Sequence, residues 1–207
     1  LTADLIKQWR KRWYNEKKGH KFKGRVFLIS PKDYDEPIDT QQVFRIRVDN
    51  ENFVNEDTRI QMKDFENSLV IFDYCEALTK ELRLGVMDLL NKILTLGRSY
   101  HISCINIVHQ ITNFRESRIP IIESDTVIIF PKSGLRHQYE RFLKIYCGYS
   151  KDEAQTILEL PTDRYIIIHK NYPRFFMTPK YLYTNDYIYK LTKDRKDRLI
   201  EEREMAK

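Results

Sequence analysis

The sequence lacks the features that mark membrane, secreted and zinc-knuckle proteins. No apolar run in the 207 residues approaches the roughly 20 residues that span a bilayer, and the N-terminus has no basic-then-apolar pattern of a secretory signal. The three cysteines, Cys75, Cys104 and Cys147, are too far apart for a CxxC pair, and the five histidines form neither HxxxH nor HExxH. We therefore expect reduced thiols in the core of a protein from a reducing compartment.

What is present is typical of one globular domain, with 42% hydrophobic and 32% charged residues. The net charge of +6 is uneven, because residues 1–25 carry nine Lys or Arg against Asp4 and Glu16. The other residues are close to neutral in sum. A basic block on a neutral body indicates either a polyanionic partner or simply a solvated helix face.

Hydrophobic periodicity predicts strands alternating with helices, and hence a parallel α/β sheet. Apolar residues every four positions predict a helix over residues 1–18, and a similar stripe predicts a long helix over residues 79–96. There is no internal repeat. We expect one core over residues 1–185 and a charged helix or tail over 186–207. Strands are predicted at residues 25–30, 43–48 (an exposed or edge strand), 69–73, 102–110, 125–130, 164–170 and 174–178.

Polar residues of catalytic type end three of these strands. "LVIFD" ends in Asp73, "INIVHQ" in His109 and Gln110, and "RVFLIS" in Ser30. Ligands of parallel α/β sheets gather at the carboxyl ends of the strands. Asp73 is therefore either a magnesium-holding acid or only the first polar residue after a buried strand. Gln110 is either a sensor of the γ-phosphate or a partner of a loop backbone.

An ordered series of motifs extends these local patterns. It runs "SLVIFDYCEAL", "LGRSYHISCINIVHQITN", "RESRIPIIESDTVIIFPKSG" and "YCGYS…LPTDRYIIIHKNYPRFFMTP". From about Leu1 to Pro179 the chain resembles the genome-packaging ATPases of nucleocytoplasmic large DNA viruses and virophages, which are relatives of the FtsK/HerA translocases. The resemblance implies a RecA-like P-loop NTPase fold of the ASCE type, in which helices flank a parallel sheet.

The resemblance also implies roles for single residues. Asp73 takes the Walker B position that holds Mg²⁺, and Gln110 takes the polar sensor position on the next strand. Arg118 lies where relatives have an arginine after the "HQxTN" block. It is a candidate arginine finger for a neighbouring subunit's nucleotide. Arg115 is the nearest rival for that role, and a structural salt bridge is the alternative.

The sequence departs from the family pattern in two places. No phosphate-binding GxxxxGK[ST] loop occurs in the chain, and "LTADLIKQWRKRW" resembles the helix that follows that loop. Since the chain also lacks an initiating Met, we expect it to begin just after the loop, inside a longer product. Without the loop's strand, normally in the middle of the sheet, we expect a poorly buried core and weak nucleotide binding.

The second departure concerns the acid that commonly follows the Walker B aspartate. Tyr74 stands there, and a tyrosine, with an unperturbed pKa near ~10, is no carboxylate base at neutral pH. Glu76 is the next carboxylate and the candidate for orienting water. Alternatively, Glu76 only begins the following helix, where an acid interacts well with the helix dipole.

Together the resemblance implies an ATP-driven translocase of double-stranded DNA that packages a viral genome with ATP and Mg²⁺. It also implies a homo-oligomeric ring (hexamer or pentamer), capsid or portal-vertex partners, and a place in the host cytoplasm (viral factory) or the virion. One alternative is a catalytically inactive P-loop-like DNA-binding or scaffold subunit, and another is a cellular HerA- or FtsK-like motor. The candidate DNA-binding residues lie on the first helix: Lys7, Arg10, Lys11 and Arg12.

Overall fold

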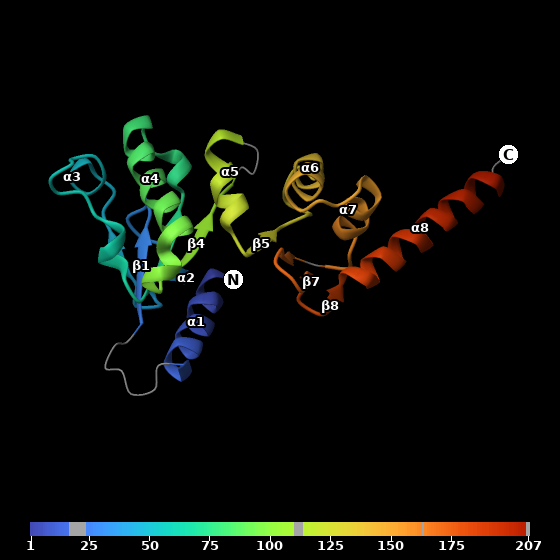
Figure 1. Cartoon of the computed structure of the whole chain (residues 1–207), viewed down its shortest axis with the longest axis horizontal. Coiled ribbons are helices and arrows are strands. Elements are labelled where there is room, and N and C mark those ends of the chain that lie inside the picture. Colours follow the sequence, from blue (N-terminus) through green and yellow to red (C-terminus); the bar gives the residue numbers. More distant parts are fainter. Residues whose placement is uncertain (17–23, 110–113, 163, 206–207) are drawn as a thin grey trace. The chain divides into compact units, whose positions relative to one another are not determined.

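The computed structural model describes residues 1–16, 24–109, 114–162 and 164–205. The chain forms two compact units, Leu1–Gln110 and Ile111–Lys207, and each is described by itself (Figure 1). The prediction of a single ATPase core over residues 1–185 concerns the assembly of both units and stays a prediction.

A four-stranded parallel sheet is the centre of the first unit. Its order is β2 (Phe44–Ile46), β1 (Arg25–Ile29), β3 (Ser68–Asp73) and β4 (Ser103–Ile107), so β2 is an edge strand, as its sequence predicts. Ile29 pairs with Phe72 and Asp73 pairs with Ile107, which brings the carboxyl ends of the strands to one edge. A parallel α/β sheet flanked by helices is thus confirmed.

Helices cover both faces of this sheet, which explains the continuous apolar run of β3. Leu69 and Ile71 pack on one face with Ile6 of helix α1 (Thr2–Glu16). Val70 and Phe72 pack on the other face with the apolar stripe of helix α4 (Lys80–Leu96). Figure 1 shows α1 and α4 on opposite sides of the strands.

The expectation of a poorly buried core is wrong for most of the first unit. Val26, Leu28 and Ile71 are 0% exposed, because two helical layers exclude water from both faces of β1 and β3. The exception is β4, in which every residue is only partly buried. Within the described residues β4 pairs with β3 alone, so its other edge carries no strand.

Short helices lie between the strands and the long helices of the first unit. They are α2 (Glu36–Asp39), α3 (Asn50–Phe53) and the 3-10 helices η1 (Met62–Phe65), η2 (Cys75–Ala77) and η3 (Gly97–Tyr100). Gly85 allows α4 to approach α3 closely, since a Cβ atom there would lie 2.2 Å from the carbonyl oxygen of Phe53. Only a glycine permits this contact without a shift of backbone.

The second unit contains an antiparallel sheet, and the parallel arrangement predicted for its strands is wrong. The order is β5 (Thr126–Ile129), β6 (Ile166–His169), β7 (Phe175–Met177) and β8 (Leu182–Thr184). The connections of β6 to β7 and of β7 to β8 are far shorter than the dozen residues a parallel crossover requires. Strand β8 has only three residues, and its sequence did not predict it.

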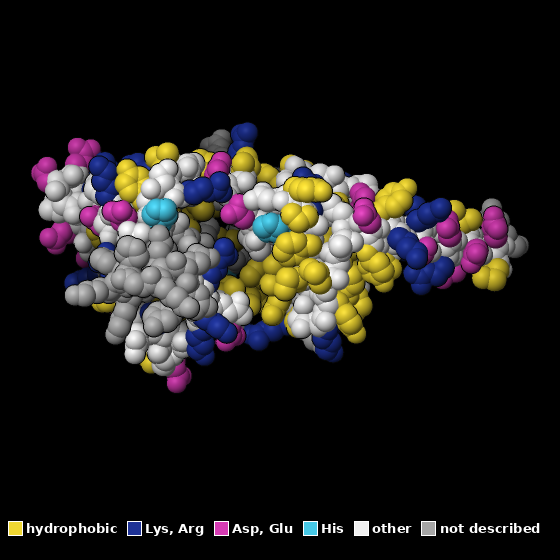
Figure 2. All heavy atoms as spheres, turned by 60° about the horizontal axis from the view of Figure 1, so that its bottom comes forward, with side chains coloured by type: hydrophobic (Ala, Val, Ile, Leu, Met, Phe, Trp, Pro, Cys, Tyr) yellow, Lys and Arg dark blue, Asp and Glu magenta, His cyan; other side chains and the backbone are white. Residues whose placement is uncertain are grey.

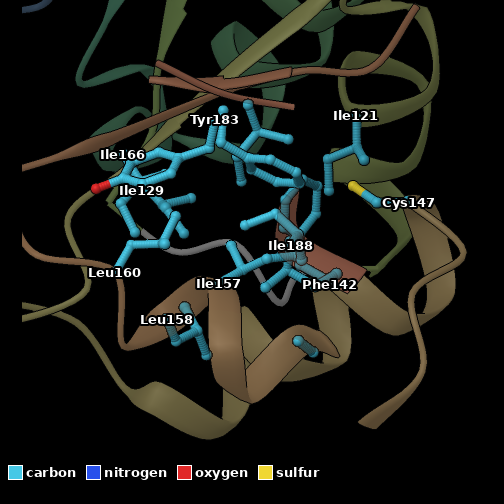
Figure 3. Packing of buried hydrophobic residues seen from close by; sticks show 14 residues of the cluster. Ile121, Ile129, Phe142, Cys147, Ile157, Leu158, Leu160, Ile166, Tyr183 and Ile188 are labelled. Carbon is cyan, nitrogen blue, oxygen red and sulfur yellow. The ribbon is translucent and has the colours of Figure 1, made fainter. Parts of the chain in front are cut away.

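One face of the antiparallel sheet carries the core of the second unit. Ile166, Phe176 and Tyr183 from the strands meet Phe142 of helix α6 (Arg136–Tyr146) and Ile157 of helix α7 (Lys151–Leu158) (Figure 3). A capping box starts α7. Ser150 Oγ accepts from the Glu153 backbone N–H at 3.3 Å, and the Glu153 carboxylate accepts from the Ser150 N–H at 2.8 Å.

The other face of this sheet exposes apolar side chains. Ile128, Ile167, Met177 and Leu182 lie directly opposite one another in a single row across the four strands, and Leu182 is 65% exposed. Figure 2 shows hydrophobic side chains gathered on the second unit. Helix α5 (Phe114–Glu123) precedes the sheet and helix α8 (Asn185–Met205) follows it, the latter with charges of both signs along its length.

All three cysteines are free thiols, as predicted, and none of the helices in the described part of the chain is long and apolar enough to cross a membrane. Burial raises the pKa of Cys75 and Cys104 to about 12 and that of Cys147 to about 11. These values make the thiols poor nucleophiles at neutral pH.

Candidate functional site

The carboxyl edge of the parallel sheet brings together the ends of β1, β3 and β4. Ser30 follows β1 and is 4% exposed, and its hydroxyl accepts a hydrogen bond from the Lys32 backbone N–H at 3.3 Å. Asp73 ends β3, and His109 lies two residues beyond β4. The three strand ends named from the sequence therefore share one edge, as predicted for a ligand site of a parallel sheet.

Asp73 is buried at this edge, with 3% of its surface exposed. Within the described residues its carboxylate accepts no hydrogen bond, and its one ionic partner is the Lys32 ammonium at 4.0 Å. Burial raises the pKa of Asp73 because it penalises the charged form, and the nearby positive charge of Lys32 only partly opposes this. A buried carboxylate without donors is costly for folding, which makes it a candidate for binding a cation.

Lys32 is the residue of this site that sequence reasoning missed. Its ammonium lies 3.3 Å from Asp35 Oδ2, 4.0 Å from Asp73 Oδ2 and 3.5 Å from the centre of the Tyr74 ring. Burial alone would lower the pKa of Lys32, but its hydrogen bonds to Asp35 and Tyr74 and the charge of Asp73 raise it. The lysine thus stays charged beside the candidate metal ligand.

An ion pair behind Lys32 holds its loop in place. The Arg45 guanidinium bonds both oxygens of Asp39, at 2.5 and 3.3 Å, and donates to the Lys32 carbonyl oxygen at 2.5 Å. Asp39 in turn accepts from the Asp35 backbone N–H at 2.6 Å. Both side chains of the pair are mostly buried, at 20% and 17% exposed. The pair therefore fixes the loop from which Lys32 and Asp35 extend.

Tyr74 connects two of the strand ends through its ring. Its backbone is left-handed, with φ of 57°, and its ring lies 4.4 Å from the His109 ring, centre to centre. Lys32 lies over the same ring. The Tyr74 ring is thus an aromatic platform that contacts both Lys32 and His109.

Glu76 forms a hydrogen bond with the segment that follows β4. Its carboxylate accepts from the His109 backbone N–H, with oxygen-to-nitrogen distances of 3.0 and 3.3 Å. It also lies in the short 3-10 helix η2, ahead of α4 and not at its start, where the alternative placed it. Glu76 thereby joins the turn after β3 to the segment after β4 that leads to Gln110.

The remaining candidates are Gln110, Arg115 and Arg118. Gln110 lies outside the described residues, and so does the Arg115 side chain. Arg118 is exposed on α5 in the second unit, and the described residues form no ion pair with it. The structure thus brings Asp73 and the Glu76 turn together, while the roles of Gln110 and Arg118 stay predictions.

The basic helix α1 presents only part of its predicted DNA-binding set. Lys7, Lys11 and Arg12 are exposed. Arg10 instead donates to the backbone carbonyls of Gln41 and Gln42, and its partial burial lowers its pKa. Arg10 therefore fixes the loop before β2, and its contact with DNA stays a prediction.

Comparisons of the chain with known protein families, curated proteins and solved structures find no match.

Proposed function

We propose that this chain is the Walker B part of an ATP-driven double-stranded DNA translocase that packages a viral genome. The observation that carries the proposal is Asp73, a buried carboxylate without hydrogen-bond donors in the described residues, at the carboxyl edge of a parallel sheet. The ordered motif series from "SLVIFDYCEAL" to "KNYPRFFMTP" supports the same family.

The strand order supports a RecA-like sheet in particular. Side chains of β4 contact both cores of the first unit, Cys104 on the α4 side and Ile105 on the α1 side, as those of an internal strand do. Yet within the described residues β4 has a strand on one edge only. A RecA-like sheet carries its phosphate-loop strand in the middle, and the open edge of β4 is where a further strand would add.

The residues present fit Mg²⁺ in the manner of nucleotide-dependent enzymes. Among the described residues no three His, Cys, Asp or Glu side chains form a metal cage. Mg²⁺ needs none, because it keeps several waters and binds through one or two carboxylates together with substrate phosphates. Asp73 would hold the ion, and the ion, when bound, neutralises charge that develops on the transferred phosphoryl group.

The chain's own residues would then divide the remaining tasks. Glu76 holds the segment after β4 through the His109 N–H, and His109 directly precedes Gln110, the candidate sensor, in the sequence. Exposed Arg118 would reach the nucleotide of a neighbouring subunit in a ring. Lys7, Lys11 and Arg12 would contact phosphates of the DNA backbone without reading its sequence.

One set of contacts favours the alternative, an inactive P-loop-like DNA-binding or scaffold subunit. Tyr74 replaces the usual second acid, Glu76 is engaged with a backbone N–H, and Lys32 already neutralises Asp73. Such a subunit would bind DNA with a strong dependence on salt and would hydrolyse no ATP.

DNA-stimulated ATP hydrolysis by the full-length gene product distinguishes the two functions. For a motor we expect hydrolysis that rises with added duplex DNA and that Asp73→Ala abolishes. Asp88→Ala is the matched control, because Asp88 is an exposed acid of α4 that pairs with Lys92. Hydrolysis that survives Asp73→Ala would overturn the role of Asp73, and DNA binding without any hydrolysis would favour the inactive subunit.

A further inference from the structure

The Lys32 ammonium lies beside Asp73, the candidate metal ligand, where its charge would oppose that of a metal ion. Its ammonium is the only positive group within ion-pair distance of the Asp73 carboxylate among the described residues, at 4.0 Å. The same ammonium lies 3.3 Å from Asp35, so one lysine neutralises two carboxylates. A divalent ion bound to Asp73 would face this ammonium across a few ångströms of a mostly buried site.

The surroundings hold Lys32 in this place from two sides. The Tyr74 ring lies 3.5 Å below the ammonium, a cation–π contact that stabilises a charge over its face. Behind it, Arg45 fixes the Lys32 carbonyl. The lysine side chain is 34% exposed, so its ammonium has a path to solvent by rotation of its own side chain, without movement of the backbone.

We propose that Lys32 is the resident counter-ion of Asp73 and that a divalent metal must displace it, so that the lysine and the metal compete for one carboxylate. This inference rests on the proposed function for the identity of the metal ligand. The inference also gives Tyr74 a role. Its ring, at the position of the usual second acid, holds the lysine that competes with the metal. The metal site is then closed by an ion pair until metal binds, and the released ammonium becomes available to an anion such as a phosphate.

Binding of Mn²⁺, a spectroscopic substitute for Mg²⁺, tests the competition without any measurement of hydrolysis. Free Mn²⁺ is followed by electron paramagnetic resonance during titration of the full chain. Lys32→Met removes the charge and keeps the side chain's length, and we expect its Kd for Mn²⁺ to fall by roughly tenfold or more, from Coulomb's law at this separation. Lys92→Met removes the lysine of an exposed carboxylate pair on α4 and should leave the Kd unchanged.

The Asp73→Asn change in the Lys32→Met background tests separately whether Lys32 competes with the metal and whether Asp73 is the metal ligand. Loss of the gained affinity would support competition at Asp73. Equal affinities of wild type, Lys32→Met and Lys92→Met, including no binding by any of them, would overturn the role of Lys32. A gain that persists in the double variant would overturn Asp73 as the metal ligand, and with it the proposed function.

A measurement on the unmodified chain guards against misfolded variants. The Lys32 side-chain protons lie over the Tyr74 ring, so their resonances should be shifted upfield by the ring current. Saturation with Mg²⁺ should return them toward the values of a solvated lysine. Resonances that stay shifted while the Asp73 signals respond to Mg²⁺ would contradict displacement.

Discussion

The ion pair of Arg45 and Asp39 offers the sharpest test of how the Lys32 loop is held. Arg45→Met removes a bidentate contact at 2.5 and 3.3 Å and a bond to the Lys32 carbonyl at 2.5 Å. A hydrogen bond to a charged group contributes about 1.5–3 kcal/mol, and the substitution also leaves Asp39 without its partner at 17% exposure. Breaking fully buried pairs costs about 3–5 kcal/mol, so we expect about 2–4 kcal/mol here.

Urea unfolding of a double-mutant cycle measures this coupling. Arg45→Met, Asp39→Asn and the double variant should give a coupling of about 1–3 kcal/mol at neutral pH. Arg47→Met is the matched control, because Arg47 is 88% exposed and its pair with Asp49 is long, at 3.5 Å. We expect the control to change the free energy of unfolding by less than about 0.5 kcal/mol.

The pH dependence of the coupling has a definite sign. Burial opposes ionisation of Asp39, but its bonds to Arg45 and to the Asp35 N–H outweigh this and lower its pKa from the ordinary 3.8. A lowered folded-state pKa stabilises the fold above the unfolded value, and this contribution is lost as the pH falls through the folded-state pKa. A coupling absent at neutral pH, or one that persists in full where Asp39 is protonated, would refute the reasoning.

Three further predictions concern single positions. Glu76→Ala should speed exchange of the His109 amide proton with solvent, whereas Glu76→Gln, which keeps an acceptor, should do so less; equal rates in all three proteins would contradict the contact. Gly85→Ala should destabilise the first unit by about 1–3 kcal/mol in urea unfolding despite alanine's higher helix propensity, because of the Phe53 carbonyl, and a stabilised variant would refute this. Cys75, with its pKa raised by burial from 9.0 to about 12, should be alkylated about a thousandfold more slowly in the native chain than in urea; comparable rates would show that the thiol is accessible.

The parallel sheet could be predicted from the sequence because its signal is local. The run Leu69–Phe72 is apolar at every position, and only a strand covered on both faces requires that pattern. The stripe of α4 and the capping box of α7 are equally local. The antiparallel order of β5 to β8 was missed because alternation of strands and helices was extended to a region where short connections decide the direction.

The candidate site could be predicted only in part, for a similar reason. Asp73 directly follows the apolar run Leu69–Phe72, and this run predicts its position at the edge of the sheet. Lys32 follows β1 by three residues, and nothing local distinguishes it from other surface lysines. Lys32 reaches Asp73 only because β1 pairs with β3, which places the ends of these two strands side by side. The contacts of Arg10 could not be predicted either, because its partners, the carbonyls of Gln41 and Gln42, are distant in sequence.

The left-handed backbone of Tyr74 links the shape of the turn to the occupancy of the site. A non-glycine residue at φ of 57° costs on the order of 1 kcal/mol, which the ring's contacts with Lys32 and His109 help to offset. When Lys32 leaves the ring, one of those contacts is lost and the extended backbone of residue 74 becomes relatively more favourable. The same turn carries Glu76, so the backbone at Tyr74 also sets where the Glu76 carboxylate meets the His109 N–H. The strained residue thus connects Lys32 through its ring, and the segment after β4 through its turn, to the end of the strand that carries Asp73.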